Sequence, residues 1–268
     1  MVDWKAIFSE ISSEIYHKIK PILNTKKAKE IVGKGAGGDL TRYIDALAEE
    51  CAIMVLKKNN ISCILVSEES GTKKIGDNPK NYVVLDPIDG TNNALRRLPF
   101  FCTSIALSTG PNLNNVELGF VMNLSNKETF FAEKNHGAYR GKTCLKPSLI
   151  TNVTNAIISV ELSLPHNQQH LKRLTPLLLN LPRVRHLGAT ALEICYVASG
   201  ALEAFIDLRN IARSVDLAAA YIIIKEAGGL MVTPDGNEID LSINPAERIP
   251  LIAAANEAIC KDVLRLIM

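Results

Sequence analysis

The segment YVVLDPIDGT, residues 82–91, joins a run typical of a buried strand to two acidic residues. Asp86 and Asp89 stand three residues apart at the carboxyl end of that strand, which is where α/β sheets bind ligands. We expect Pro87 to end the sheet ladder, because proline has no backbone N–H and a fixed φ, so that both carboxylates turn into one small volume.

Two carboxylates held this close repel one another unless a cation lies between them. A hard divalent ion such as Mg²⁺ takes oxygen ligands and keeps positions for water and phosphate oxygens. Gly90 lets the backbone approach an anion closely, and the N–H groups of a helix that starts at Thr91 can hold a phosphate. The segment alone is also compatible with a turn at Asp86 and Asp89 and a helix cap at Thr91.

Two further segments place acids at comparable positions. The stretch ILVSEE, residues 64–69, is an apolar run that ends in Glu68 and Glu69, and Asp216 opens an apolar helical segment at 216–227. Each has a simpler interpretation: the glutamates as a solvated loop, and Asp216 as a helix cap that favours the helix dipole. Their combination with Asp86 and Asp89 favours a site that gathers oxygen ligands for a metal.

Length and composition describe a globular protein. The chain has 268 residues, of which 47% are hydrophobic and 22% charged, and a formal net charge of +2, which argues against a nucleic-acid partner. The start, MVDWKAIFSEIS, lacks the apolar stretch of a secretion signal, and the apolar run 217–224 is far shorter than the roughly 20 residues that cross a bilayer. The six cysteines form no C-x-x-C pair. We therefore expect a cytoplasmic protein with reduced thiols and no membrane partner.

The hydrophobic pattern changes near the middle of the chain. Residues 3–20 and a segment that ends near Asn59 have helical periodicity and flank the glycine-rich stretch 33–39. After a polar segment at 142–155, strands alternate with helices, which is typical of α/β units. Short β-rich runs before that segment predict a largely antiparallel sheet: 61–66, 82–85, 102–108, 116–122 and 129–133. We expect an α/β (α+β) fold with an antiparallel-rich half at 1–145 and an α/β half at 146–268.

Several motifs together resemble the inositol monophosphatase family. They keep that family's order and span nearly the whole chain: residues 33–41 with Asp45, SEES at 67–70, DPIDGT at 86–91, GATA at 188–191, VDLAAA at 215–220 and EAGG at 226–229. DPIDGT and the pair of VDLAAA with EAGG are specific to the family, whereas the glycine-rich stretch alone is a weak signal. Within the family, the length and the segment 207–209 look most like the archaeal type that hydrolyses both inositol monophosphates and fructose 1,6-bisphosphate.

The resemblance implies an αβαβα layered sandwich of the sugar-phosphatase type, commonly a homodimer, and a phosphomonoesterase that uses two or three Mg²⁺ ions and is commonly inhibited by lithium. It assigns the first metal to Glu68, Asp86 and the carbonyl of Ile88, and the second to Asp86, Asp89 and Asp216. Thr91, hydrogen-bonded to Asp45, would orient and deprotonate the attacking water, with Glu68 assisting.

We expect the second half of the chain to recognise a polyol or sugar phosphate. Arg185, Arg209 and Arg213 could meet a second phosphate, although surface or interface positions are the simpler expectation. Lys34 in the glycine-rich stretch could close over the site as part of a mobile loop. The remaining substrate-binding candidates are Asp89, Gly90, Thr91, Gly188, Ala189, Thr190, Asp207 and Asp216.

The chain departs from the family pattern at two places: Asn93-Ala94 and Arg96-Arg97 replace an Asn-Phe pair and a His-Gly, and Val215 replaces a Trp. The histidines at 17, 136, 166, 170 and 186 fall outside every motif, and we interpret them as structural or surface residues. Two alternative functions stay open: a 3′-phosphoadenosine 5′-phosphate nucleotidase with the same metal core, and a non-catalytic partner protein that retains the fold.

Overall fold

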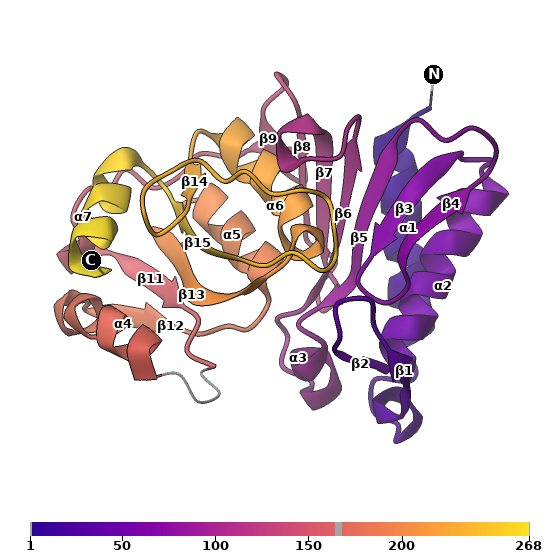
Figure 1. The fold of residues 1–268 in the computed structure, drawn as a ribbon, viewed down its shortest axis with the longest axis horizontal. Coiled ribbons are helices and arrows are strands. Elements are labelled where there is room, and N and C mark those ends of the chain that lie inside the picture. The colour runs from indigo at the N-terminus through magenta and orange to yellow at the C-terminus, as the bar shows by residue number, and fades with distance from the viewer. Residues whose placement is uncertain (1, 164–167, 268) are drawn as a thin grey trace.

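The computed structural model describes residues 2–163 and 168–267, whose helices and sheets stack in alternating layers (Figure 1). The larger sheet has the strand order β10-β9-β8-β7-β6-β5-β3-β4. It is antiparallel throughout except for the parallel neighbours β3 and β5. Its strands are β3 (Cys63–Ser67), β4 (Gly71–Ile75), β5 (Tyr82–Asp89), β6 (Cys102–Ser108), β7 (Val116–Asn123), β8 (Thr129–Glu133), β9 (Ala138–Arg140) and β10 (Thr143–Cys144).

The second sheet has the order β12-β11-β13-β15-β14. Its strand β11 is parallel to both of its neighbours, and the remaining pairs are antiparallel. Its strands are β11 (Ile157–Val160), β12 (Arg183–Arg185), β13 (Ala204–Ala212), β14 (Leu230–Val232) and β15 (Ile249–Ala254). A small hairpin of β1 (Ile31–Lys34) and β2 (Leu40–Arg42) stands apart from both sheets.

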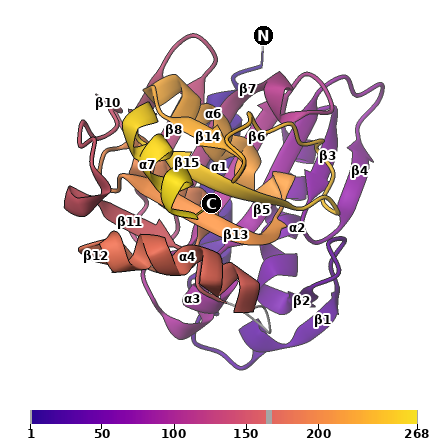
Figure 2. The ribbon, with the colours of Figure 1, turned by 60° about the vertical axis from the view of Figure 1, so that its left-hand side comes forward.

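Helices form the other three layers, and Figure 2 shows the molecule with the second sheet turned toward the viewer. Helices α1 (Trp4–Ile19) and α2 (Tyr43–Lys58) cover the outer face of the larger sheet. Helices α5 (Thr190–Ala198) and α6 (Ser214–Ala227) lie between the two sheets. Helices α4 (Gln168–Asn180) and α7 (Glu257–Ile267) cover the outer face of the second sheet. The αβαβα sandwich expected from the sequence is therefore confirmed.

Burial explains why these sequences form these layers. Ile7, Ile11, Ile15 and Ile19 recur every four residues and form the buried stripe of α1, which is the pattern of a helix with one face on a sheet. Helix α6 is buried at every position from 214 to 224, because sheets cover it on both sides. The apolar run at 217–224 thus belongs to a central layer of the core. Within the described residues, no helix is both long and apolar enough to span a membrane.

One local expectation needs correction. Pro87 does not end its strand: β5 continues to Asp89, with an irregular register in which Asp86 faces Ser104 and Asp89 faces Cys102. The sequence patterns also missed β4 and the β1–β2 hairpin, since both are short and largely exposed. His166 lies outside the described residues. Short helices complete the fold: α3 (Thr91–Arg96) and the 3-10 segments Lys27–Lys29, Leu113–Asn115 and Val153–Asn155.

Candidate active site

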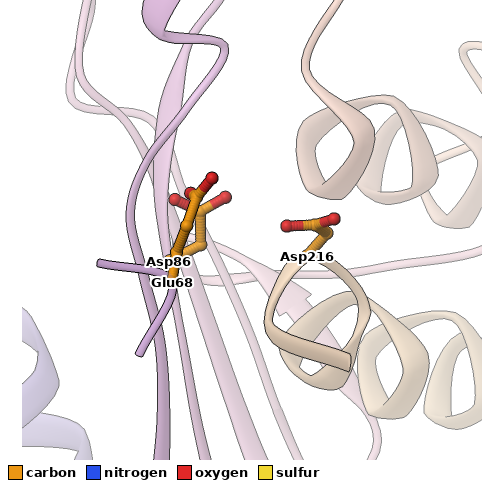
Figure 3. A group of neighbouring side chains, drawn as sticks. All are labelled: Glu68, Asp86 and Asp216. Carbon is orange, nitrogen blue, oxygen red and sulfur yellow. The ribbon is translucent and has the colours of Figure 1, made fainter. Parts of the chain in front are cut away.

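Three carboxylates from separate segments meet at the carboxyl end of the parallel β3–β5 pair. Glu68 directly follows β3, Asp86 lies within β5, and Asp216 lies in the first turn of α6. One carboxylate oxygen from each lies within 4.8 Å of the others. Figure 3 shows Glu68 and Asp86 side by side, with Asp216 facing them from its helix. The packing of α6 against the larger sheet therefore brings together acids that are about 150 residues apart in the chain.

Burial and the repulsion of neighbouring carboxylates disfavour the ionised forms of Glu68 and Asp86. Burial is the largest cause that raises the pKa of Glu68 to about 7, and the guanidinium of Arg213 opposes it. The pKa of Asp86 is raised well above its ordinary value, first by burial and then by Glu68, Asp89 and Asp216. Like charges in a dry site need a cation to remain ionised at neutral pH.

Arg213 supplies one such cation within the described residues. Its Nη2 atom lies 2.5 Å from Glu68 Oε1 and 3.0 Å from Asp216 Oδ1, and its Nη1 atom lies 3.3 Å from Asp39 Oδ2. Its side chain is 11% exposed, so the expectation of a surface or interface position is wrong for this arginine. One guanidinium does not balance the cluster of acids, and carboxylate oxygens are the ligands that hard divalent cations prefer. The residues present therefore fit a Mg²⁺-type ion.

Glu68, Asp86 and Asp216 line one cavity, and Asp89 lines it too. The hydrogen-bond partners of Asp89 are backbone N–H groups at the start of α5. Its Oδ1 accepts a hydrogen bond from the backbone N–H of Thr190 at 3.1 Å, and its Oδ2 accepts one from Ala191 at 2.7 Å. Asp89 thus ties the end of β5 to the start of α5. Burial, and then Asp216, raises the pKa of Asp89 to about 8.

Thr91 and Asp45 lie beside the three carboxylates. The Thr91 hydroxyl is 2.9 Å from Asp45 Oδ1 and 3.0 Å from the carbonyl of Ile88. Asp45 is 5% exposed, and burial followed by the charge of Glu69 raises its pKa to about 8. The hydrogen bond between threonine and aspartate that the resemblance implies is therefore present.

The turn before α5 is held by two residues that the sequence analysis did not identify as site residues. Glu193 is 2% exposed and accepts hydrogen bonds from the backbone N–H of Gly188 at 2.8 Å and of Ala189 at 3.4 Å. Asn93 donates to the carbonyls of Leu187 at 2.7 Å and Phe100 at 2.8 Å. A glutamate four residues into a helix is too common a pattern to reveal such a role from sequence.

Gly90 is the position where this turn requires glycine. Its φ of +87° lies in the left-handed region, and a Cβ there would lie 3.1 Å from the Ala189 Cβ and from the Gly188 carbonyl oxygen. The close approach of Gly90 joins the DPIDGT segment to the GATA segment in one wall of the site.

The glycine-rich stretch is the tip of the β1–β2 hairpin and covers a second, adjoining cavity of about 500 Å³. Arg248 Nη2 donates to the carbonyl of Gly37 at 2.8 Å, and the contact of Arg213 with Asp39 holds the same tip. Lys34 is exposed on β1 and does not line either cavity at the site. The loop is therefore held by two arginines that reach it from the second half of the chain.

The substrate candidates are placed unequally around the first cavity, whose volume is about 250 Å³. Asp207 is 0% exposed, and both of its carboxylate oxygens accept hydrogen bonds from Arg209, so Arg209 faces the cavity in its place. Arg185 is exposed and lies outside the cavity lining. The predicted site residues that line it are Glu68, Asp86, Ile88, Asp89, Gly90, Thr91, Gly188, Thr190, Arg209 and Asp216, together with Arg213 and the unexpected Glu161.

Known proteins are similar to this chain in sequence and in fold. The model of the inositol monophosphatase family matches residues 3–267. The fructose-1,6-bisphosphatase/inositol-1-monophosphatase of Methanothermobacter thermautotrophicus is 34% identical, over 98% of this chain and 95% of the relative. The bifunctional NADP phosphatase/NAD kinase of Methanococcus maripaludis is also 34% identical, over 95% of this chain but only 47% of the relative.

Solved structures agree with the sequence matches. A crystal structure of an inositol monophosphatase–fructose 1,6-bisphosphatase superposes with a TM-score of 0.88 and 33% identity, covering 99% of this chain and 100% of the other. A protein of Pyrococcus horikoshii with similarities to inositol-1 monophosphatase superposes with a TM-score of 0.84 and 29% identity, covering 99% and 98%. The family match spans every segment that brings a carboxylate to the cavity, and the chain is therefore a phosphatase that belongs to the inositol monophosphatase family.

Proposed function

We propose that this protein is a Mg²⁺-dependent phosphomonoesterase that hydrolyses inositol monophosphate and fructose 1,6-bisphosphate. The observation that carries this proposal is the meeting of Glu68, Asp86 and Asp216 within 4.8 Å, beside the hydrogen bond between Thr91 and Asp45. An acidic cavity of this kind repels a phosphate ester, and so the reaction needs cations that neutralise both the acids and the substrate.

Five residues would hold two or three Mg²⁺ ions: Glu68, Asp86, the carbonyl of Ile88, Asp89 and Asp216. When bound, the ions supply positive charge for the phosphoryl oxygens and make a bound water more acidic. Arg213 already contacts two of these carboxylates and limits their mutual repulsion. Asp89 would keep the hydrogen bonds that it accepts from the backbone N–H groups of Thr190 and Ala191, and it would still line the site.

Thr91 and Asp45 would handle the proton of the attacking water. The Thr91 hydroxyl can accept a hydrogen bond from water while it donates its own proton to Asp45. Because the pKa of Asp45 is raised to about 8, its ionised form is a stronger base than an ordinary aspartate carboxylate. Glu68 lies beside the same cavity wall and would assist.

On the leaving-group side, the substrate's polyol would lie against Gly188, Thr190 and Arg209. Asp207 would act through Arg209, which it orients, and Glu193 would act by holding the turn at Gly188. The phosphoryl group would thus lie beside Glu68, Asp86 and Asp216, and the hydroxyl groups of the substrate would lie beside Gly188, Thr190 and Arg209.

Phosphate release tests the proposal. The purified protein is incubated with inositol 1-phosphate, fructose 1,6-bisphosphate, 3′-phosphoadenosine 5′-phosphate and NADP, with Mg²⁺ or with EDTA. NADP is included because of the similarity to the bifunctional NADP phosphatase/NAD kinase. We expect release from the first two substrates only with Mg²⁺. Preference for either nucleotide would replace the proposed substrate class, and background release with a stoichiometric bound partner would favour the non-catalytic alternative.

Three further properties are proposed from the family resemblance alone. We propose a homodimer in the cytoplasm, with inhibition by lithium. Light scattering on the purified protein, cell fractionation and a lithium titration of phosphate release test these three points separately.

A further inference from the structure

Glu161 is a buried acid of the cavity that the proposed chemistry does not use. It directly follows β11, is 6% exposed and lines the same cavity as Asp86 and Asp216. Its Oε1 atom accepts a hydrogen bond from the backbone N–H of Ser163 at 2.9 Å, lies 3.3 Å from Arg209 Nη1 and lies 3.3 Å from His186 Nδ1. Among residues 2–163 and 168–267 these contacts all fall on Oε1, so Oε2 can accept a hydrogen bond from a ligand.

Arg209, the guanidinium beside Glu161, has little capacity left for a phosphate. Its Nε and Nη2 atoms donate to Asp207 at 2.9 and 2.8 Å, and its Nη1 atom is shared between the Ser163 carbonyl at 3.4 Å and Glu161. A guanidinium has five N–H donors, and these contacts leave one of them. The strong bidentate grip on a phosphate needs two parallel donors.

The net charge of the wall formed by Glu161, Asp207, Arg209 and His186 also disfavours a second phosphate. Two carboxylates, Glu161 and Asp207, face the single positive charge of Arg209. A neutral His186 leaves the wall with a net negative charge, and a cationic His186 brings it to zero. Neither state provides the excess of positive charge that binds a phosphate dianion. Arg213, the other guanidinium of the cavity lining, is engaged by Glu68 and Asp216.

We propose that Glu161 determines substrate specificity. It accepts a hydrogen bond from a polyol hydroxyl of the leaving group and disfavours a second phosphate beside Glu161 and Arg209. This inference rests on the proposed phosphatase function and ranks its substrates. With one phosphate at the Glu68–Asp86–Asp216 wall, the rest of the molecule extends toward Glu161 in a cavity of about 250 Å³. Inositol 1-phosphate presents a hydroxyl there, and fructose 1,6-bisphosphate brings a second dianion into the same space.

Glu161→Gln tests the proposal, because it removes the charge and keeps the size. We expect the ratio of kcat/KM for inositol 1-phosphate over fructose 1,6-bisphosphate to fall by about tenfold or more, mainly through KM. Glu203→Gln is the matched control: Glu203 is also buried, 4% exposed, but it contacts Ile157 at the opposite end of β11 and lies outside both cavities. Thermal unfolding checks that both variants fold.

Ligand binding separates this inference from the proposed function. The dissociation constants of both ligands are measured by calorimetry in the presence of Ca²⁺, for the wild type and for both variants. A shifted ratio of dissociation constants, together with no phosphate release in the Mg²⁺ assay, would support the role of Glu161 and overturn the proposed substrates. Phosphate release with a ratio that Glu161→Gln leaves within threefold of the wild type would overturn the role of Glu161. Failure of the wild type to bind either ligand would overturn both.

Discussion

Replacement of Asp86 by asparagine tests the electrostatics of the three-carboxylate cluster most directly. Asparagine has nearly the same shape, and its Oδ1 can keep the hydrogen bond that Asp86 accepts from the backbone N–H of Ile88 at 3.0 Å. The change therefore removes one negative charge with little disturbance of packing. Asp86 lies within 4.8 Å of both Glu68 and Asp216, so it takes part in two of the repulsive pairs.

The size of the effect follows from the distances. Two unit charges 4.8 Å apart repel by about 3.5 kcal/mol at an effective dielectric constant of ~20. Proton uptake by the raised-pKa acids, together with Arg213, already relieves part of this repulsion in the wild type. We therefore expect Asp86→Asn to raise the free energy of unfolding of the metal-free protein by about 1–3 kcal/mol. The melting temperature in EDTA then rises by roughly 2–8 °C.

Activity is expected to change in the opposite direction. Loss of a carboxylate that would bind both metals should lower phosphate release by at least about 100-fold, since even residues that only orient metal ligands contribute 10- to 100-fold. The assays are thermal unfolding in EDTA and in Mg²⁺, calorimetric Mg²⁺ binding, and phosphate release. Glu257→Gln, which removes a carboxylate with 79% side-chain exposure, serves as the control. A variant that melts lower in EDTA, or that keeps near-normal turnover, would refute the reasoning.

Three further predictions concern the surroundings of the cluster. Thr91→Val should lower kcat by about 100-fold and leave Mg²⁺ affinity unchanged, whereas Thr91→Ser should restore most turnover; equal losses in both variants would argue against a hydroxyl role. Glu193→Ala should destabilise the fold by about 1–3 kcal/mol and raise KM, because two backbone N–H groups lose their acceptor; unchanged unfolding would contradict this. In EDTA, the pKa values of about 8 for Asp45 and about 7 for Glu68 lie above those of the unfolded chain, so stability should fall as pH rises from about 4 to 8. Added Mg²⁺ should suppress that fall, and a flat melting profile in EDTA would disprove it.

Sequence patterns predicted the elements whose burial is regular. The stripe at Ile7, Ile11, Ile15 and Ile19 predicted α1, and strand β6 at Cys102–Ser108 has the predicted bounds. Short exposed strands such as β4, Gly71–Ile75, lack such a pattern, because only their ends are buried. The division into halves at 1–145 and 146–268 remains a prediction.

The candidate site was predicted in part. Motif order identified the acids at Glu68, Asp86, Asp89 and Asp216, since each ends a strand or begins a helix with a strong local pattern. The partners of these acids were not identified. Arg213 was expected at a surface or interface, and Glu161 was not singled out, because neither residue stands in a local pattern that indicates what lies opposite it.

The amino-acid order by itself determined the strands and helices whose burial is regular, and it determined that acids stand at the ends of several of them. Tertiary structure alone decided that Glu68, Asp86 and Asp216 lie within 4.8 Å, that Arg213 lies among them, and that Arg209 is held by Asp207 and Glu161. The physical reason is the distance along the chain over which each kind of interaction acts. Periodicity and capping act over a few residues, whereas these distances depend on how two sheets and a central helix layer pack against one another.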